Sequence, residues 1–132
     1  MSARRTVTPV AAALLLLAAT AHAERPPAEQ YLLHCSGCHG PDGRGSPPTT
    51  PSLHGLGDLL AAPGGRAYLA RVPGAAQAPV SDGELARLLG WVLQEFSQTP
   101  VEPPYSAEEV GSLRARPLRD PLRARPVIQE RR

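Results

Sequence analysis

C-S-G-C-H-G-P-D-G-R-G, at residues 35–45, is the stretch that decides the fold. Its Cys35 and Cys38 are the only two cysteines of the 132-residue chain, and His39 directly follows the second of them. The pattern C-x-x-C-H is the signature of covalent attachment of c-type haem. Two thiols at this spacing can each form a thioether with one haem vinyl group, and His39 is then placed to donate an imidazole nitrogen to the iron.

Three other interpretations of the two cysteines compete with haem attachment. A disulfide across two intervening residues is strained and closes almost no loop. A thioredoxin-like redox pair needs a βαβ setting, and no convincing strand is predicted. A zinc site that adds His39 and either His34 or His54 lacks the second spaced ligand pair typical of zinc motifs. The sequence therefore favours haem attachment.

The same segment resembles the haem-binding segment of class I monohaem cytochromes c. In that family the pattern CHGxxGxG is common and is followed by Pro-x-Leu-x-Gly, which residues 51–55 match. The resemblance covers roughly residues 28–96 and implies a small all-α domain around one covalent haem c. It implies that Cys35 and Cys38 attach the haem and that His39 is the proximal iron ligand.

The resemblance also implies two finer features of the haem-binding loop. The carbonyl oxygen of Pro51 is expected to accept a hydrogen bond from Nδ1 of His39, which fixes the orientation of the ring. The three glycines of the motif are expected to let the backbone approach the haem edge. These glycines are Gly40, Gly43 and Gly45.

The first 23 residues have the pattern of a secretory signal peptide. Arg4 and Arg5 form a positively charged start, residues 10–19 are an unbroken apolar run, and an A-H-A cleavage signal ends at Ala23. The apolar run falls short of the about 20 residues that span a bilayer, which disfavours an uncleaved membrane anchor. We predict cleavage after Ala23, a periplasmic protein, and no stable membrane span after cleavage.

The charge of the chain is unevenly distributed after the predicted cleavage site. All fourteen basic residues of the chain are arginine. Residues 24–100 carry five arginines and seven acids, whereas residues 111–132 carry seven arginines and two acids. A near-neutral body with a basic tail is not typical of a nucleic-acid binder, although the tail suits an acidic partner or membrane surface.

Helical patterns dominate the chain between the motif and the tail. The clearest is residues 82–96, where Ser81 and Glu84 have the spacing of a capping box and apolar residues recur at helical spacing. Weaker patterns predict a first helix and two short ones, and no strand. Their expected ranges are 26–36, 56–62 and 65–72. The family resemblance implies that the first helix crosses the helix over 82–96, with Trp91, interpreted as a core residue, near the haem side of the crossing.

The expected domain organisation has three parts. Residues 1–23 are the signal peptide, residues 24–98 the haem domain, and residues 99–132 a Pro/Arg-rich extension. Within the extension, a second capping-box spacing predicts a short helix over 106–116. We expect the rest to be extended or disordered when alone. It either docks on a redox partner or is a solvated tail without function.

The second iron ligand is the feature in which the chain departs from the family. Most class I cytochromes c supply a methionine from the loop that corresponds to residues 71–80, but the only methionine here is Met1. Methionine ligation is therefore excluded after signal cleavage. The alternatives are His54 as a distal ligand, Gln77 or another group of the loop, a ligand from a partner protein, or an open or water-occupied position. His34 is interpreted as a surface histidine.

Three residues of the stretch G-G-R-A-Y-L-A-R have expected places near the haem. Arg66 either forms a bidentate contact with a haem propionate or lies on the surface of a short helix. Tyr68 and Leu69 are expected to pack on the haem rather than to take part in chemistry.

These features predict a protein that carries single electrons and is not an enzyme, because no paired carboxylates or activated nucleophile accompany the motif. The expected partners are an exported dehydrogenase and an oxidase or other acceptor, without nucleic acid. One alternative is a haem protein whose open sixth position binds or senses small ligands. Another is a haem subunit of a larger redox complex.

Overall fold

The regular structure is entirely helical in residues 24–130, which the computed structural model describes, with side chains described through residue 125. The helices are α2 (Pro27–His34), α3 (Ser36–His39), α4 (Gly57–Ala61), α5 (Gly65–Arg71), α6 (Pro73–Ala76), α7 (Asp82–Ser97), α8 (Ala107–Arg114) and α9 (Pro121–Glu130). Within these residues, a single isolated bridge is the only strand-like pairing. The all-α fold is therefore confirmed. The signal peptide expected over residues 1–23 lies outside the described residues.

Helix α7 is the central element, and it begins as its sequence predicts. Ser81 Oγ accepts a hydrogen bond from the Glu84 backbone N–H at 3.2 Å, and the Glu84 carboxylate accepts one from the Ser81 N–H at 2.8 Å. Both halves of the capping box are thus formed. The apolar face of the helix is buried, and its most enclosed side chains are Leu85, Leu88 and Leu93.

Helix α2 crosses α7 through a cluster of aromatic rings. Tyr31 of α2 is 1% exposed, and its ring centroid lies 5.5 Å from that of Trp91 and 4.9 Å from that of Phe96. The crossing that the family resemblance implies is therefore present. The expected first helix over 26–36 is broken at Cys35, whose backbone leaves the helical region and separates α2 from α3.

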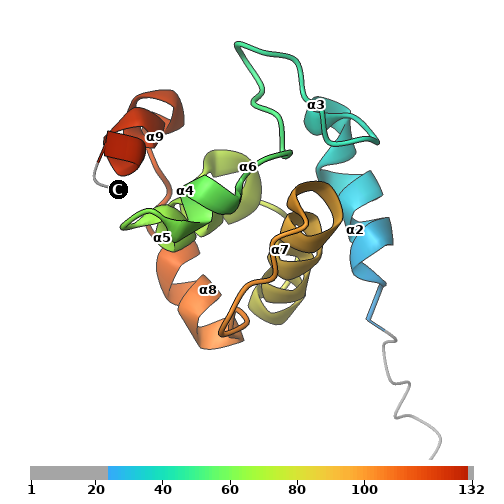
Figure 1. Ribbon diagram of the computed structural model, residues 1–132. Coiled ribbons are helices and arrows are strands. Elements are labelled where there is room, and N and C mark those ends of the chain that lie inside the picture. The colour runs from blue at the N-terminus through green and yellow to red at the C-terminus, as the bar shows by residue number, and fades with distance from the viewer. Residues whose placement is uncertain (1–23, 131–132) are drawn as a thin grey trace, which may run out of the picture.

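Helices α4, α5, α6, α8 and α9 lie on the other side of α7 from α2 (Figure 1). There α5 packs against α4 and α8, and α9 contacts α4 and α5. The two short helices expected near residues 56–62 and 65–72 are α4 and α5. The sequence did not predict α6, a single turn that begins at Pro73. None of the described helices is long and apolar enough to cross a membrane.

The extension is a packed part of this domain. Ser106 Oγ caps α8 by accepting from the Glu109 N–H at 3.1 Å, as its spacing predicts, and Val110 is completely buried. The expectation of an extended or disordered remainder is wrong, because α9 forms. Asp120 supplies its N-cap, with Oδ1 accepting from the Arg123 N–H at 2.9 Å, and Pro121 occupies the first helical position, where proline is favoured.

Candidate haem-binding site

A cavity of about 550 Å³ opens beside the C-x-x-C-H motif, a size within the usual range of ligand pockets. Cys35, Cys38 and His39 line one part of it. Much of the rest of the wall is apolar and comes from α7, from α5 and from the chain around α6. These apolar residues include Leu69, Val72, Pro73, Ala75, Ala78, Leu85, Leu88, Leu89, Val92 and Leu93.

The orientation of His39 is fixed by one hydrogen bond. Its Nδ1 lies 3.1 Å from the carbonyl oxygen of Pro51, as the family resemblance implies. A carbonyl oxygen only accepts, so Nδ1 carries the proton and Nε2 keeps a free lone pair. Burial lowers the pKa of the His39 imidazole more than the Pro51 contact raises it, which favours the neutral ring that a metal needs.

Glycines shape the loop that joins His39 to Pro51. The Gly45 N–H donates to the His39 carbonyl at 2.7 Å, and Gly45 has a φ of +66° at which any Cβ would collide with backbone carbonyls. Gly43 has a φ of +70° and lies against the ring of Phe96. Neither these glycines nor Gly40 lines the cavity. They fold the loop that positions His39, and their expected role in letting the backbone approach the haem edge stays a prediction.

Both cysteines are free thiols. Cys35 is half-buried, and burial, with a smaller effect from the neighbouring Cys38, raises the pKa of its thiol. Within residues 24–130, no group of three or more potential ligands is arranged to hold a metal ion, which argues against the zinc interpretation. The absence of a sheet in the same residues argues against a thioredoxin-like pair.

A family model described as cytochrome c matches residues 28–105, more than half of the chain. The chain belongs to the cytochrome c family. A comparison with curated proteins finds no match. Cytochromes c contain covalent haem c and are electron carriers rather than enzymes, as the sequence predicts. The match ends before α8, so α8 and α9 lie beyond it.

The cavity of this cytochrome c fits a haem group. Two thiols and an imidazole with a free Nε2 open into a space with mainly apolar walls, as a porphyrin bound at this motif requires. Tyr68 and Leu69 line the cavity in agreement with their expected packing on the haem. Leu122 of α9 also lines it, although its side chain is 52% exposed.

His54 and Gln77, the two side chains that the sequence offered by name as distal ligands, do not line the cavity. His54 does not line the cavity, and its Nε2 lies 2.7 Å from the carbonyl oxygen of Asp42, while its ring contacts Phe96. The Pro51 to Gly55 turn that presents the Pro51 carbonyl thus carries His54 away from the cavity. Gln77 is exposed and also lies outside the lining.

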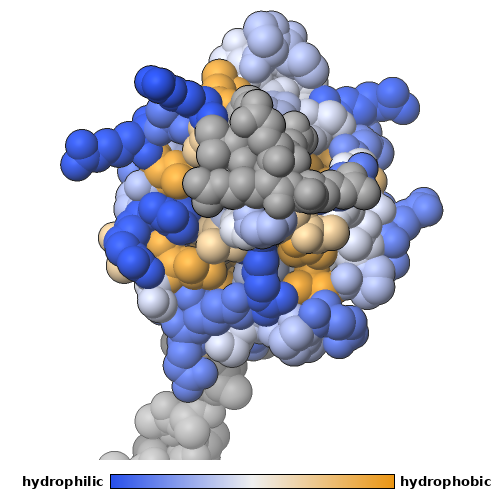
Figure 2. All heavy atoms as spheres, turned by 60° about the vertical axis from the view of Figure 1, so that its left-hand side comes forward, coloured by the Kyte–Doolittle hydropathy of each residue, from blue (hydrophilic) through white to orange (hydrophobic). Residues whose placement is uncertain are grey.

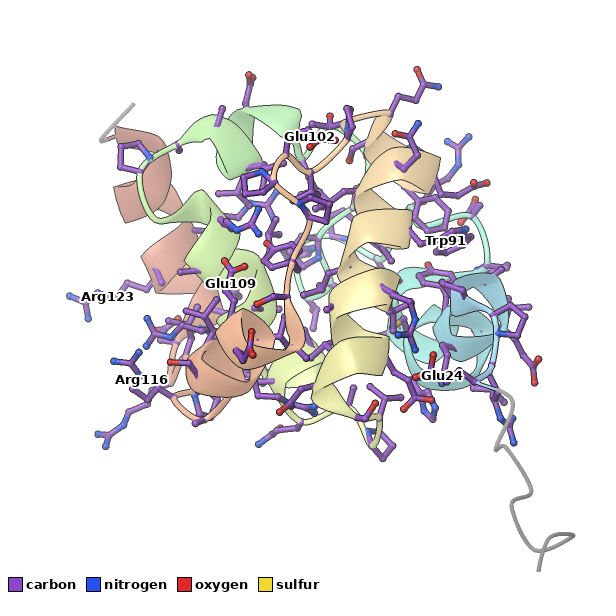
Figure 3. The ribbon with its side chains drawn as sticks, turned by 90° about the horizontal axis from the view of Figure 1, so that it is seen from below. Glu24, Trp91, Glu102, Glu109, Arg116 and Arg123 are labelled. Atoms are coloured by element: carbon purple, nitrogen blue, oxygen red, sulfur yellow. The ribbon has the colours of Figure 1, made fainter. Side chains whose placement is uncertain are left out.

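Arg66 contacts the extension, and Trp91 lies at the α2–α7 crossing that the family resemblance implies. The Arg66 guanidinium forms a two-pronged ion pair with Glu109, donates to the Pro103 carbonyl at 2.7 Å, and lies 4.2 Å from the ring centroid of Tyr105. It therefore holds the extension rather than facing the cavity. Trp91 belongs to the α2–α7 crossing, where Figure 3 shows it, but it does not line the cavity.

Arg114 is the important residue that sequence reasoning missed. Its side chain is only 15% exposed and donates to the carbonyl oxygens of Ala76 at 2.9 Å, Ala78 at 2.5 Å and Val80 at 2.8 Å. It also reaches Asp82 at 3.2 Å. These carbonyls belong to the loop from which most class I cytochromes c supply the axial methionine. Nothing in the local sequence around Arg114 signals this contact.

Three further hydrogen bonds attach the extension to α5. The Leu118 N–H donates to the Arg71 carbonyl at 2.8 Å, and Arg71 Nε donates to the Arg116 carbonyl at 2.7 Å. The Tyr68 hydroxyl donates to the Pro121 carbonyl at 2.9 Å. As a result, residues 119–122 and 125 form part of the cavity wall.

Proposed function

We propose that this cytochrome c is a periplasmic carrier of single electrons, with haem attached through Cys35 and Cys38 and with His39 as the proximal iron ligand. The observation that carries the proposal is the 3.1 Å contact between His39 Nδ1 and the Pro51 carbonyl. This contact leaves a free lone pair on Nε2 of His39, beside two free thiols.

Each residue then has a defined task. Each cysteine S–H adds across a haem vinyl double bond, so both must enter as reduced thiols and no electron is exchanged. The Pro51 carbonyl holds the His39 ring and raises the basicity of its nitrogen. The apolar wall excludes water and tunes the potential of the iron. The bound haem supplies the redox chemistry by taking up and releasing one electron.

Electrons are proposed to enter and leave beside the attachment motif. Leu32 is 57% exposed and Leu33 is 54% exposed, and both directly precede His34 and Cys35. Exposed apolar side chains grouped beside a functional site are typical of protein contact surfaces. An exported dehydrogenase and its downstream oxidase or other acceptor are the partners we propose for this surface.

The sixth coordination position is proposed to carry no ligand from the described side chains. Apart from the motif itself, the cavity-lining groups capable of binding iron are His34, Tyr68 and Asp120. His34 immediately precedes Cys35, the Tyr68 hydroxyl donates to Pro121, and the Asp120 carboxylate caps α9. This arrangement also favours a second function, the binding of small ligands at an open iron.

The test is the absorption spectrum of protein made with an active c-type maturation system. A pyridine haemochrome of the c type is expected for the native chain and is expected to be lost in Cys35→Ala/Cys38→Ala. Its absence in the native chain would refute haem attachment. A ferrous spectrum that shifts on addition of carbon monoxide would support the open position, whereas a low-spin spectrum unchanged by carbon monoxide would refute it.

A further inference from the structure

The arginines that line the cavity both come from the extension. Arg119 and Arg125 contribute to its wall, and no other arginine with a described side chain does so. Neither forms an ion pair with a carboxylate among the side chains of residues 24–125. Burial raises the pKa of the Tyr68 hydroxyl, and the neighbouring Arg125 guanidinium offsets part of that rise.

Arginines elsewhere in the body already have partners. Arg44 pairs with Asp42, Arg66 with Glu109, and Arg87 with Glu24. Arg114 is committed to the loop carbonyls described above. Among the described side chains, Arg119 and Arg125 are thus cavity-lining guanidiniums without a carboxylate partner, and Arg125 contacts the Tyr68 hydroxyl.

Hydrogen bonds of neighbouring residues hold the segment that carries these two arginines in place. Leu118, directly before Arg119, is held by its hydrogen bond to the Arg71 carbonyl. Pro121 is held by Tyr68, and the Asp120 cap starts the helix that carries Arg125. Figure 2 looks onto the side of α9 and shows hydrophilic side chains projecting around this face, with apolar surface between them.

We propose that Arg119 and Arg125 bind the two propionate carboxylates of the haem, so that the extension completes the cofactor site. The inference rests on the haem attachment proposed above. Haem brings two carboxylates into a mainly apolar cavity, where an anion without a partner is costly. Guanidinium groups match carboxylates in charge and geometry. The Asp120 carboxylate also lines the cavity and would repel the propionates, but the two arginine charges outweigh its single negative charge.

The test is the pH dependence of the midpoint reduction potential. Deprotonation of a propionate favours ferric iron, so the potential falls across the pH range in which the propionate titrates. Arg119→Gln and Arg125→Gln each remove a cation and should move that range upward by about half a unit to one unit. Asp120→Asn keeps an N-cap residue but removes an anion, so it should move the range downward.

Arg123→Gln is the matched control, because it makes the same charge change in the same segment, on the helix that carries Arg125. Arg123 does not line the cavity, and Figure 3 shows it at the outer edge of the molecule. If the propionate titrates over the same pH range in Arg119→Gln and Arg125→Gln as in Arg123→Gln, the proposal is overturned. If a glutamine variant does not accumulate, Arg119→Lys or Arg125→Lys compared with Arg123→Lys gives the same decision, since a displaced cation still shifts the range upward.

The test of Arg119 and Arg125 can be distinguished from the test of haem attachment. The pyridine haemochrome reports covalent haem in every variant, independently of its potential. A normal haemochrome with an unshifted titration range contradicts only the roles of Arg119 and Arg125. A missing haemochrome in the native chain contradicts the attachment on which they rest.

Discussion

The guanidinium of Arg114 lies 2.8 Å from the carbonyl oxygen of Val80 and so joins the extension to the loop that precedes α7. Two further loop carbonyls accept from the same side chain. A methionine bound to iron holds this loop in most class I cytochromes c, and this chain has no methionine after residue 1. Hydrogen bonds from α8 therefore stabilise a loop that contains no methionine.

Replacing Arg114 should release this loop. Arg114→Gln is expected to lower the free energy of unfolding by about 3 kcal/mol, because buried carbonyls lose charged donors. Denaturant unfolding measures the change. Arg116→Gln, an exposed neighbour, should stay within about 0.5 kcal/mol of the native chain. Equal effects of the two substitutions would contradict the proposed role of Arg114 in holding the loop.

The ion pair between Arg66 and Glu109 should make the extension sensitive to acid. The hydrogen bond from Arg66, followed by the charge of that residue, lowers the pKa of Glu109 below its ordinary value of about 4.3. Its stabilising effect is therefore complete above that value and is lost as the pH falls through the lower, folded-state pKa. Thermal unfolding of Glu109→Gln should approach that of the native chain only as the pH falls through this lowered, folded-state pKa. Glu108 is exposed, so the difference in thermal unfolding between Glu108→Gln and the native chain should not depend on pH in this way.

Gly45 should resist substitution, since its left-handed backbone brings it against the Thr50 and Pro51 carbonyls. Gly45→Ala is expected to cost about 2 kcal/mol or more and to reduce the yield of holoprotein, because it displaces the acceptor of His39. Gly37→Ala is the control, as a Cβ there meets nothing within 4 Å. Yield and unfolding midpoint measure both, and a harmless Gly45→Ala would contradict this account of the loop.

His54 should not be needed as an iron ligand. Because its ring lies outside the cavity and contacts Asp42 and Phe96, His54→Ala should leave the oxidised and reduced spectra unchanged. A change from low-spin to high-spin iron in this variant would restore His54 as the distal ligand.

The apolar surface beside the motif should control electron transfer between molecules. Leu33→Glu places a carboxylate there, and two approaching copies would then repel each other. The electron self-exchange rate, measured by nuclear magnetic resonance line broadening, should fall about tenfold at low salt. Gln94→Glu, the same charge change on exposed α7 surface, should have little effect. Equal rates in both variants would place the electron-transfer surface elsewhere.

Sequence reasoning predicts the features that depend on local patterns. The capping box of Ser81 and Glu84 starts α7 as expected, and its apolar spacing identifies the buried face. The contact between His39 and Pro51 follows from a family resemblance rather than from local chemistry, and it is present. The start and buried face of α7 and the contact between His39 and Pro51 each involve residues that are separated by only a few helical turns or by one loop.

The extension shows where such reasoning fails. The prolines near its end suggested a disordered tail, although Asp120 followed by Pro121 is a local helix-start signal that was available. The Ser106 capping box forms only in half, because the Glu109 carboxylate binds Arg66, 43 residues earlier in the chain. Long-range pairs such as this one, and Arg114 with its loop, leave no trace in local spacing.

The cavity wall is assembled from segments that emerge from synthesis at very different times. A chain made from its N-terminus presents Cys35 and Cys38 early, whereas residues 119–125 follow after α7 and α8. Until then the pocket lacks one wall. We expect the attachment machinery to meet an open half-site and the last segment to close over haem that is already bound. One wall of the cavity therefore comes from a segment about 80 residues beyond the attachment cysteines.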